Sequence, residues 1–272
     1  MKNLLKNPFF YVSLLLVIVT FLIIGLYVTQ EKRGFIGQLP QSNSVENWSC
    51  GDSVTFVYKG SSVTYGTVKS QDKCWLDRNL GALQVAIAYN DANAYGDLFQ
   101  WGRGDDGHQQ RDSEITLESS NSDDPGHSNF ILVDSKSYNW RDPQNDNLWQ
   151  GISGTNNPCP LGFRIPTEAE WDFERASWNG QHAGGAFMSP LKLTLIGYRS
   201  INQDSHYPQS LSEEGVYWSS TVSDERAIAL GFDETATFSP NDSNSYVTCV
   251  AGNAIIAPAY RVASYAVRCI KD

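Results

Sequence analysis

Five cysteines carry the most reactive side chains of this sequence: Cys50, Cys74, Cys159, Cys249 and Cys269. No two of them form the C-x-x-C pair that zinc sites and redox centres usually contain. Widely spaced cysteines in an exported domain typically pair as disulfides, and an odd number leaves at least one thiol unpaired or shared between chains. The spacing therefore favours structural cross-links over a metal cluster.

Acidic residues in three polar segments offer hard oxygen ligands for calcium. These are the pairs Asp105-Asp106 and Asp123-Asp124 and the segment from Asp142 to Asn147. None follows the twelve-residue EF-hand pattern, so solvated acidic loops are the simpler interpretation. If calcium binds, we expect its ligands to come from Asp105, Asp106, Asp142 and Asp146.

Two tryptophans flank the last of these segments. Trp140 and Trp149 enclose a polar loop that runs from Arg141 to Leu148. Aromatic faces beside amide and carboxylate groups are typical of a sugar-binding site, but such rings also tether long loops to a core. A ligand site here would consist of Trp140, Arg141, Asn145, Asp146, Asn147 and Trp149.

Catalytic motifs are missing. The sequence has no G-x-S-x-G, no H-E-x-x-H, no phosphate-binding loop and no dinucleotide fingerprint. Its four histidines lie apart in loop-like sequence, where a single imidazole is usually solvated: His108, His127, His182 and His206. Glu168, Glu170 and Glu174 stand where a helix begins, which favours capping and dipole roles over acid–base chemistry. We therefore predict a protein that is not an enzyme.

Short strands and one well-marked helix must position these side chains. Alternating residues in 53–58 and 63–68 predict a hairpin whose turn is Lys59 to Ser62. Thr167 and Glu170, directly after Pro166, form a capping box that predicts a helix to about Ser177. Further strands are predicted at 217–221, 227–232 and 265–270, and residues 102–160 read as loops. The predicted class is α+β, with small mixed or antiparallel sheets, few helices and long loops.

Cys50 precedes the predicted hairpin and Cys74 follows it, so the two thiols could meet across its open end. A disulfide that closes a loop of this length stabilises a fold by roughly 3 kcal/mol in the chain-entropy model.

The N-terminus contains a run of 20 mainly apolar residues, 9–28, in which only Ser13 and Thr20 are polar. At about 1.5 Å per residue the run spans roughly the 30 Å of a bilayer core. A cleaved signal peptide is the alternative, but its apolar region would be about 7–15 residues and an A-x-A site should follow. We therefore predict four regions: a cytoplasmic tail (1–8), a transmembrane signal anchor (9–28), a stalk (29–47) and one ectodomain (48–272).

The net charge of the chain is consistent with an exported domain. The chain has 20 basic and 30 acidic residues, a net charge of −10, which argues against binding to nucleic acid. Basic residues lie on both sides of the apolar run, so the positive-inside rule discriminates weakly. The short tail and the long acidic remainder favour a single-pass protein of the cell membrane, with the N-terminus cytoplasmic and the C-terminal domain extracytoplasmic.

Several motifs resemble a known family. Phe163-Arg-Ile-Pro-Thr-Glu-Ala-Glu-Trp171 is similar to the R-[LI]-P-T-E-A-E-W signature of the C-type-lectin-like fold of formylglycine-generating enzymes, and Val267-Arg-Cys-Ile270 resembles its closing strand. Residues 48–272 as a whole resemble the Fibrobacter succinogenes major paralogous domain, a bacterial cell-surface module. The motifs, in order, are Lys73-Cys-Trp-Leu-Asp-Arg-Asn-Leu-Gly81, Tyr95-Gly-Asp-Leu-Phe-Gln-Trp-Gly102, Asn157-Pro-Cys-Pro-Leu-Gly-Phe-Arg164, Gly197-Tyr-Arg199 and Tyr217-Trp-Ser-Ser-Thr221.

The resemblance implies a disulfide between Cys159 and Cys269, which, with Cys50 paired to Cys74, leaves Cys249 as the odd thiol. It implies a non-catalytic adhesion or binding module for an extracellular glycan or protein. The oxidases of this fold need two reactive cysteines before the last strand, whereas Tyr246 to Arg261 contains Cys249 alone. Two alternatives stay open: a formylglycine-generating-enzyme-like oxidase and a structural envelope component.

Overall fold

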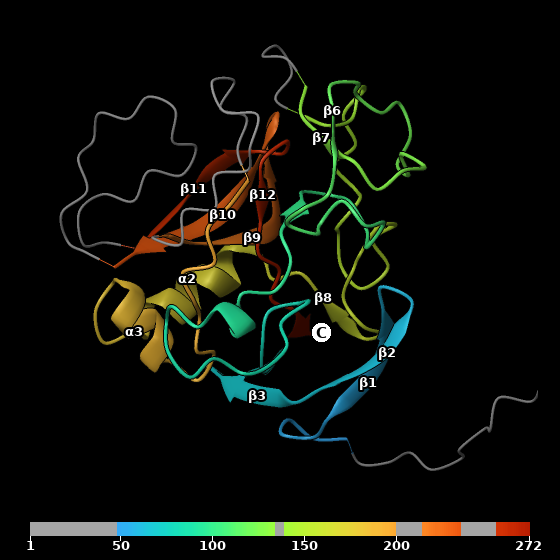
Figure 1. The fold of residues 1–272 in the computed structure, drawn as a ribbon. Coiled ribbons are helices and arrows are strands. Elements are labelled where there is room, and N and C mark those ends of the chain that lie inside the picture. The colour runs from blue at the N-terminus through green and yellow to red at the C-terminus, as the bar shows by residue number, and fades with distance from the viewer. Residues whose placement is uncertain (1–47, 134–138, 200–213, 235–253) are drawn as a thin grey trace, which may run out of the picture. The chain divides into compact units, whose positions relative to one another are not determined.

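The computed structural model describes residues 48–133, 139–199, 214–234 and 254–272 (Figure 1). The predicted tail, span and stalk, residues 1–8, 9–28 and 29–47, lie outside these ranges, as does Cys249. Within the described ranges, no helix has the length and apolar content that crossing a bilayer requires. Ser49–Asp272 forms one unit with its own core.

Short strands dominate this unit, as the sequence predicts for a sheet-rich α+β fold. The strands are β1 (Val54–Tyr58), β2 (Ser61–Tyr65), β3 (Thr67–Ser70), β4 (Lys73–Leu76), β5 (Phe99–Gln100), β6 (Ile115–Thr116), β7 (Phe130–Ile131), β8 (Phe163–Arg164), β9 (Glu214–Ser223), β10 (Arg226–Asp233), β11 (Ile255–Tyr260), β12 (Ser264–Tyr265) and β13 (Ile270–Lys271). The helices of the described residues are η2 (Ala92–Ala94), α2 (Glu168–Ala176) and α3 (Ala183–Met188).

The predicted hairpin is confirmed as β1 and β2, with Val54 opposite Tyr65 and Tyr58 opposite Ser61. Its turn is shorter than the sequence indicates, because only Lys59 and Gly60 lie between the strands. Both have positive φ, 49° and 72°. Two left-handed residues in a two-residue loop match the right-handed twist of the flanking strands.

The beginning and the end of the unit meet in one sheet. Its strand order is β3-β4-β13-β8, and Ile270 in β13 pairs with Trp75 on one side and Arg164 on the other. Two disulfides reinforce this sheet, Cys50–Cys74 and Cys159–Cys269, so both predicted pairings are confirmed. The first joins the segment before β1 to β4, and the second joins the turn before β8 to the residue that precedes β13.

The single strand predicted over 265–270 is wrong, because the chain changes sheets within it. Tyr265 in β12 pairs with β5, whereas Ile270 belongs to β13. Between them the N–H of Ala266 donates to Val216, and its carbonyl accepts from Trp218. This crossing ties the three-stranded sheet β11-β10-β9 to the four-stranded one.

The predicted helix is confirmed as α2, and its capping box is complete: Thr167 accepts from the Glu170 N–H, and Glu170 accepts from the Thr167 N–H. Burial would raise the pKa of Glu170, but hydrogen bonds from Arg164 and Thr167 outweigh it and lower that pKa to about 2. The dipole role predicted for Glu174 is wrong. This side chain is buried, and it accepts from Ser70 Oγ at 2.6 Å and from Trp178 Nε1 at 3.2 Å.

Tryptophan fills much of the interior. Six of the eight in the chain have less than 2% of their surface exposed: Trp75, Trp101, Trp140, Trp149, Trp171 and Trp218. Each large ring removes about 150–250 Å² of surface from water, which explains how a fold of such short strands gains a core.

Candidate functional site

An acidic hollow of about 200 Å³ lies among the loops that precede β8. Its lining consists of Gly104, Asp105, Asp106, Asp123, Asp124 and Asn156. The structure therefore brings together the first two acidic pairs singled out in the sequence. The third segment, from Asp142 to Asn147, does not line the hollow.

One wall of the hollow is a buried network around Asp106. Arg103 is fully buried and donates to Asp106 Oδ2 from Nη2 at 2.7 Å and from Nε at 2.9 Å. His108 is also fully buried, so the solvated histidine predicted from the sequence is wrong at this position. Its Nε2 accepts from the Gln100 N–H at 3.0 Å, and Nδ1 therefore carries the proton and donates to Asp106 Oδ1 at 2.5 Å. Both carboxylate oxygens of Asp106 therefore already accept hydrogen bonds, Oδ1 from His108 and Oδ2 from Arg103.

This network makes stability depend on pH. Burial lowers the pKa of His108 from 6.5 to about 4, although the hydrogen bond to Asp106 opposes the shift. Between these two values the unfolded chain binds a proton that the folded chain does not. We therefore expect the free energy of unfolding to fall by about 3 kcal/mol as the pH decreases from 6.5 to 4, at about 1.4 kcal/mol per pKa unit.

Urea titrations of the full chain at half-unit pH steps measure this slope, with His108→Gln as the control. Glutamine does not titrate but keeps an acceptor near the Gln100 N–H. The free energy of unfolding of this variant should therefore change little between pH 6.5 and 4. A decrease in the free energy of unfolding that begins only below pH 4.5 would indicate the protonation of carboxylates such as Glu170, whose pKa is about 2 in the folded chain. Equal slopes in the two proteins above pH 4.5 would show that His108 is not the group that titrates.

The opposite wall is held by Asp123. Its Oδ1 forms an ion pair with Arg141, 2.7 Å from Nε, and accepts a hydrogen bond from Asn145 Nδ2 at 3.0 Å. Asn156 donates from Nδ2 to the carbonyls of Asp123 and Gly102. Two of the predicted ligand residues, Arg141 and Asn145, thus support the hollow from behind.

Asp105 and Asp124 are the carboxylates left for a ligand. Each accepts a backbone N–H, from Lys59 and Gly126 respectively, and neither forms an ion pair with a described residue. The charge of Arg103 acts on Asp124 as well as on Asp106, and Arg141 pairs with Asp123; four carboxylates against two guanidinium groups still leave the hollow with an excess of negative charge. Such a site attracts a cationic group and repels anions.

The predicted stacking surface is not present in this structure, because Trp140 and Trp149 have at most 1% of their surface exposed. Trp140 Nε1 donates to the Trp101 carbonyl at 2.7 Å, and Trp149 Nε1 donates to the carbonyls of Arg103 and Asn156. The two rings are therefore core side chains that do not line the hollow, although Trp149 is bonded to the backbone of Asn156, which does. This is the loop-tethering role that the sequence left open as the alternative.

The loop between these tryptophans is fixed by Arg261. This buried guanidinium lies 4.4 Å over the Trp101 ring and pairs with Asp146 Oδ1 at 2.7 Å. Asn147 is exposed, and its N–H donates to Asn145 Oδ1. Of the six predicted ligand residues, Asn147 is the one whose side chain forms no hydrogen bond or ion pair with the described part of the chain.

Calcium fits this arrangement poorly. In the described ranges no three carboxylate, histidine or cysteine side chains are grouped as a metal site requires. Asp106 and Asp146 are already paired with arginines, and Asp142 is exposed away from the hollow. A guanidinium 2.7 Å from a carboxylate opposes a divalent cation at the same oxygen.

Sequence reasoning missed Asn156 and the pair formed by Arg103 and His108. The available signal was the glycine on each side of Arg103. Gly102 has φ +87°, and a Cβ there would lie 2.8 Å from the Leu148 side chain, so only glycine lets the two loops approach so closely. One partner of His108, Asp106, is only two residues away in sequence, but the other is the Gln100 N–H of β5, and the burial depends on that strand.

Comparisons with protein-family profiles, curated proteins and solved structures give no match to this chain. The assignment of function therefore depends on the geometry above.

Proposed function

We propose that this chain is a membrane-anchored, non-catalytic binding module of the cell surface that uses a C-type-lectin-like scaffold. The acidic hollow is its ligand site, and its ligand is a positively charged group of an extracellular protein or an amino sugar. The observation that carries the proposal is the pair Asp105 and Asp124, which line the hollow and form no ion pair with a described residue.

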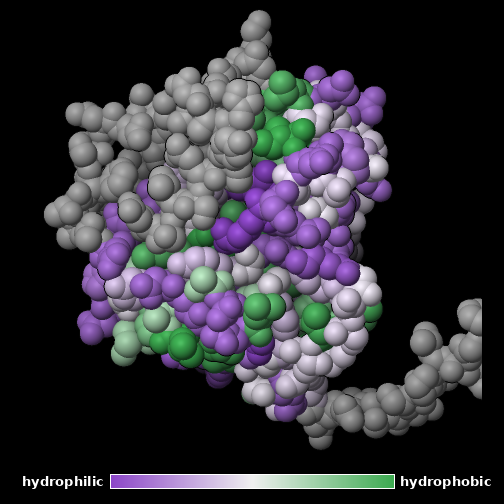
Figure 2. All heavy atoms as spheres, in the orientation of Figure 1, coloured by the Kyte–Doolittle hydropathy of each residue, from purple (hydrophilic) through white to green (hydrophobic). Residues whose placement is uncertain are grey.

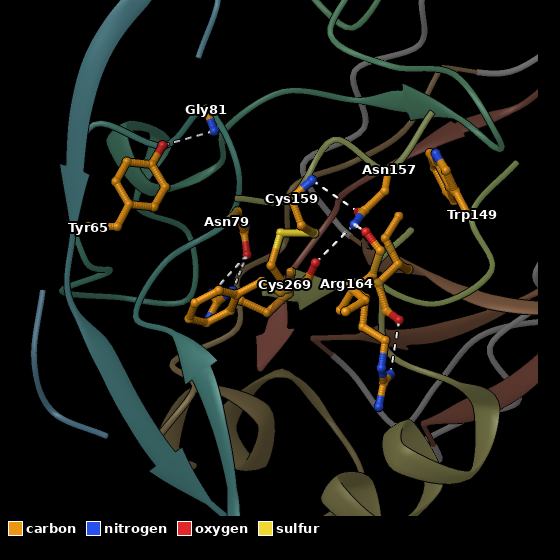
Figure 3. Close-up of a disulfide and its surroundings, with 12 residues drawn as sticks. Tyr65, Asn79, Gly81, Trp149, Asn157, Cys159, Arg164 and Cys269 are labelled. Carbon is orange, nitrogen blue, oxygen red and sulfur yellow. Dashed lines mark hydrogen bonds between the residues drawn. A yellow bond between two sulfur atoms is a disulfide. The ribbon is translucent and has the colours of Figure 1, made fainter. Parts of the chain in front are cut away.

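The residues of the family-like motifs support a scaffold of this class, because their side chains form hydrogen bonds and a disulfide that stabilise the fold. Figure 3 shows the Cys159–Cys269 disulfide with Asn157, whose side chain accepts from the Cys159 N–H and donates to the Phe163 carbonyl. Asn79, in a separate motif, lies beside them and accepts from Arg268. Side chains used in this way are unavailable for chemistry.

Cysteine pairing favours binding over oxidation. Four of the five cysteines are in disulfides. A two-thiolate copper site of the kind used by oxidases of this fold would need a second free cysteine beside Cys249. The oxidase alternative therefore has no residue support in this chain.

Binding of basic ligands tests the proposal. Full-length protein in nanodiscs is screened against lysine-rich peptides and an array that includes amino sugars. Asp105→Asn together with Asp124→Asn should weaken binding by about tenfold, since two charge-assisted contacts of modest strength are lost. The affinity should also fall as salt rises from 50 to 500 mM.

The matched control removes two exposed carboxylates elsewhere, Glu114→Gln with Glu118→Gln. An equal loss in both double variants would indicate a nonspecific charge effect. If the native chain bound neither the lysine-rich peptides nor the amino sugars, the assignment of the hollow as a ligand site would be refuted.

A further inference from the structure

The closed end of the β1–β2 hairpin reaches the acidic hollow. Lys59, in the turn, donates its backbone N–H to Asp105 Oδ2 at 3.2 Å, although the two residues are 46 positions apart in sequence. Asp105 is exposed and is one of the two carboxylates left for a ligand. In Figure 1 the tip of the hairpin points toward the loops below β6 and β7, and Figure 2 shows hydrophilic atoms over that part of the surface. A residue of the hairpin therefore contacts the ligand site without lining it.

The ammonium group of Lys59 is bound by a different carboxylate. Lys59 Nζ lies 2.8 Å from Asp97 Oδ2, and the side chain of Asp97 is only 11% exposed. The Tyr58 hydroxyl donates to the same oxygen at 2.7 Å. Because this ion pair is partly shielded from water and its acceptor is held by a second donor, it restrains the lysine side chain more than a fully exposed pair would.

Two buried tyrosines fix the strands of the hairpin to the core. The first is Tyr58, through its bond to Asp97. The second is Tyr65, whose hydroxyl donates to the Ala82 carbonyl at 3.2 Å. The same hydroxyl accepts from the Gly81 N–H at 3.0 Å, as Figure 3 shows. The strands therefore have a defined position, and the turn at their end presents its N–H groups at a defined place.

Lysine is an unfavourable residue for this turn. Lys59 has φ 49°, in the left-handed region that is strained for a residue with a Cβ. Asparagine or glycine is the usual residue at the first position of such a two-residue turn. The ion pair with Asp97 offsets this strain. The residue type therefore indicates that the ammonium group has a role beyond the turn itself.

We propose that Lys59 is a positioning residue of the ligand site: its ion pair with Asp97 fixes the turn, so that the Lys59 N–H orients the Asp105 carboxylate. This inference rests on the proposed function of the hollow. An exposed aspartate normally has several rotamers, and restricting them before binding lowers the entropy that binding costs. Because Oδ2 of Asp105 is bonded to the turn, Oδ1 is the oxygen available to a cationic group.

The sign of one substitution distinguishes positioning from charge. Lys59→Met keeps the backbone N–H but removes a positive charge near the hollow, so electrostatics alone predict tighter binding of a cation. Positioning predicts the opposite: the affinity for a lysine-rich peptide should fall by roughly threefold to tenfold, the cost of ordering one side chain. Lys59→Arg, which keeps the cation for Asp97, should restore most of the affinity. The matched control is Lys69→Met, which removes a lysine paired with Asp72 at 3.0 Å outside the hollow and should not weaken binding.

A double-mutant cycle shows whether Lys59 acts through Asp105. The affinity for the peptide is measured with full-length protein in nanodiscs for the native chain, Lys59→Met, Asp105→Ala and the double variant. In the Asp105→Ala background Lys59→Met should have no further effect, because the carboxylate that it orients is missing. Lys59→Gly repeats the test with a residue that adopts the left-handed conformation without strain, so a loss of affinity there does not come from a misfolded turn.

The outcomes separate this inference from the proposed function. If the native chain bound no lysine-rich peptide, the proposed function would be refuted and the inference with it. If the native chain bound the peptide and Lys59→Met left the affinity unchanged or raised it, the positioning role would be overturned and the hollow would remain the ligand site. An equal loss in the native and Asp105→Ala backgrounds would also overturn the role, since Lys59 would then act on the fold as a whole.

Discussion

Replacing both Cys159 and Cys269 by serine is expected to lower the free energy of unfolding by about 4.7 kcal/mol. The bond closes a loop of 110 residues, and in the chain-entropy model the stabilisation grows with the logarithm of loop length. This loop holds helices α2 and α3 and the three-stranded sheet β11-β10-β9, whereas the residues that line the acidic hollow precede it. Its loss should therefore loosen the last strand, β13, together with both of its neighbours, β4 and β8.

Guanidinium titration of the full chain in detergent, followed by tryptophan fluorescence, measures the effect. The matched control is Cys50→Ser with Cys74→Ser, which opens a loop of 24 residues and should cost about 3.4 kcal/mol. Both pairs are compared with the oxidised native chain at the same protein and detergent concentration. A control that proved more destabilising than the Cys159 and Cys269 pair would show that loop entropy does not set the order.

Local patterns predicted those elements of this chain that depend on neighbours in sequence. The alternation around Lys59 and Gly60 gave a hairpin, and the spacing of Thr167 and Glu170 gave a capped helix, because each feature involves neighbours in sequence. The long loops between Gly102 and Pro160 were also predicted. Within them the sequence did not reveal β6 and β7, a parallel pair only two residues long.

Burial of polar and aromatic side chains could not be predicted, because it depends on distant partners. For Trp140 the sequence left a ligand-stacking and a loop-tethering role open, and the choice depends on the Trp101 carbonyl, 39 residues away, which accepts from its indole N–H. Arg261 looks like a surface cation, yet it lies over Trp101 and pairs with Asp146. A charge is kept inside only where such partners exist, and a single sequence does not show which loops supply them.

The same principle gives the second large effect, at Arg268. This guanidinium is fully buried, and burial lowers its pKa to about 10, so it remains charged at neutral pH. No carboxylate is bonded to it in the described structure. Instead, Nε and Nη2 donate to Asn79 Oδ1 at 3.1 and 2.8 Å, and Nη1 donates to the carbonyls of Leu76 and Leu191.

Asn79→Leu should therefore lower the free energy of unfolding by about 3–5 kcal/mol, because it leaves two N–H donors of a buried cation unpaired. Arg268→Met should cost a similar amount, since it leaves the Asn79 oxygen and two backbone carbonyls without donors. In the double variant the two apolar side chains face each other. Its loss should fall short of the sum of the single losses by about 1–3 kcal/mol.

Denaturant titration of the four proteins completes this double-mutant cycle. The control is Arg78→Met, which removes a partly buried arginine of the same motif, 18% exposed, whose ion pair with Asp77 at 2.7 Å should contribute about 1 kcal/mol. Strict additivity of Asn79→Leu and Arg268→Met would show that the two side chains act independently. Coupling would instead show that the asparagine of the Asp-Arg-Asn motif stabilises the buried arginine of the closing segment by hydrogen bonding. The two motifs, 189 residues apart in sequence, would then depend on each other for the stability of the fold.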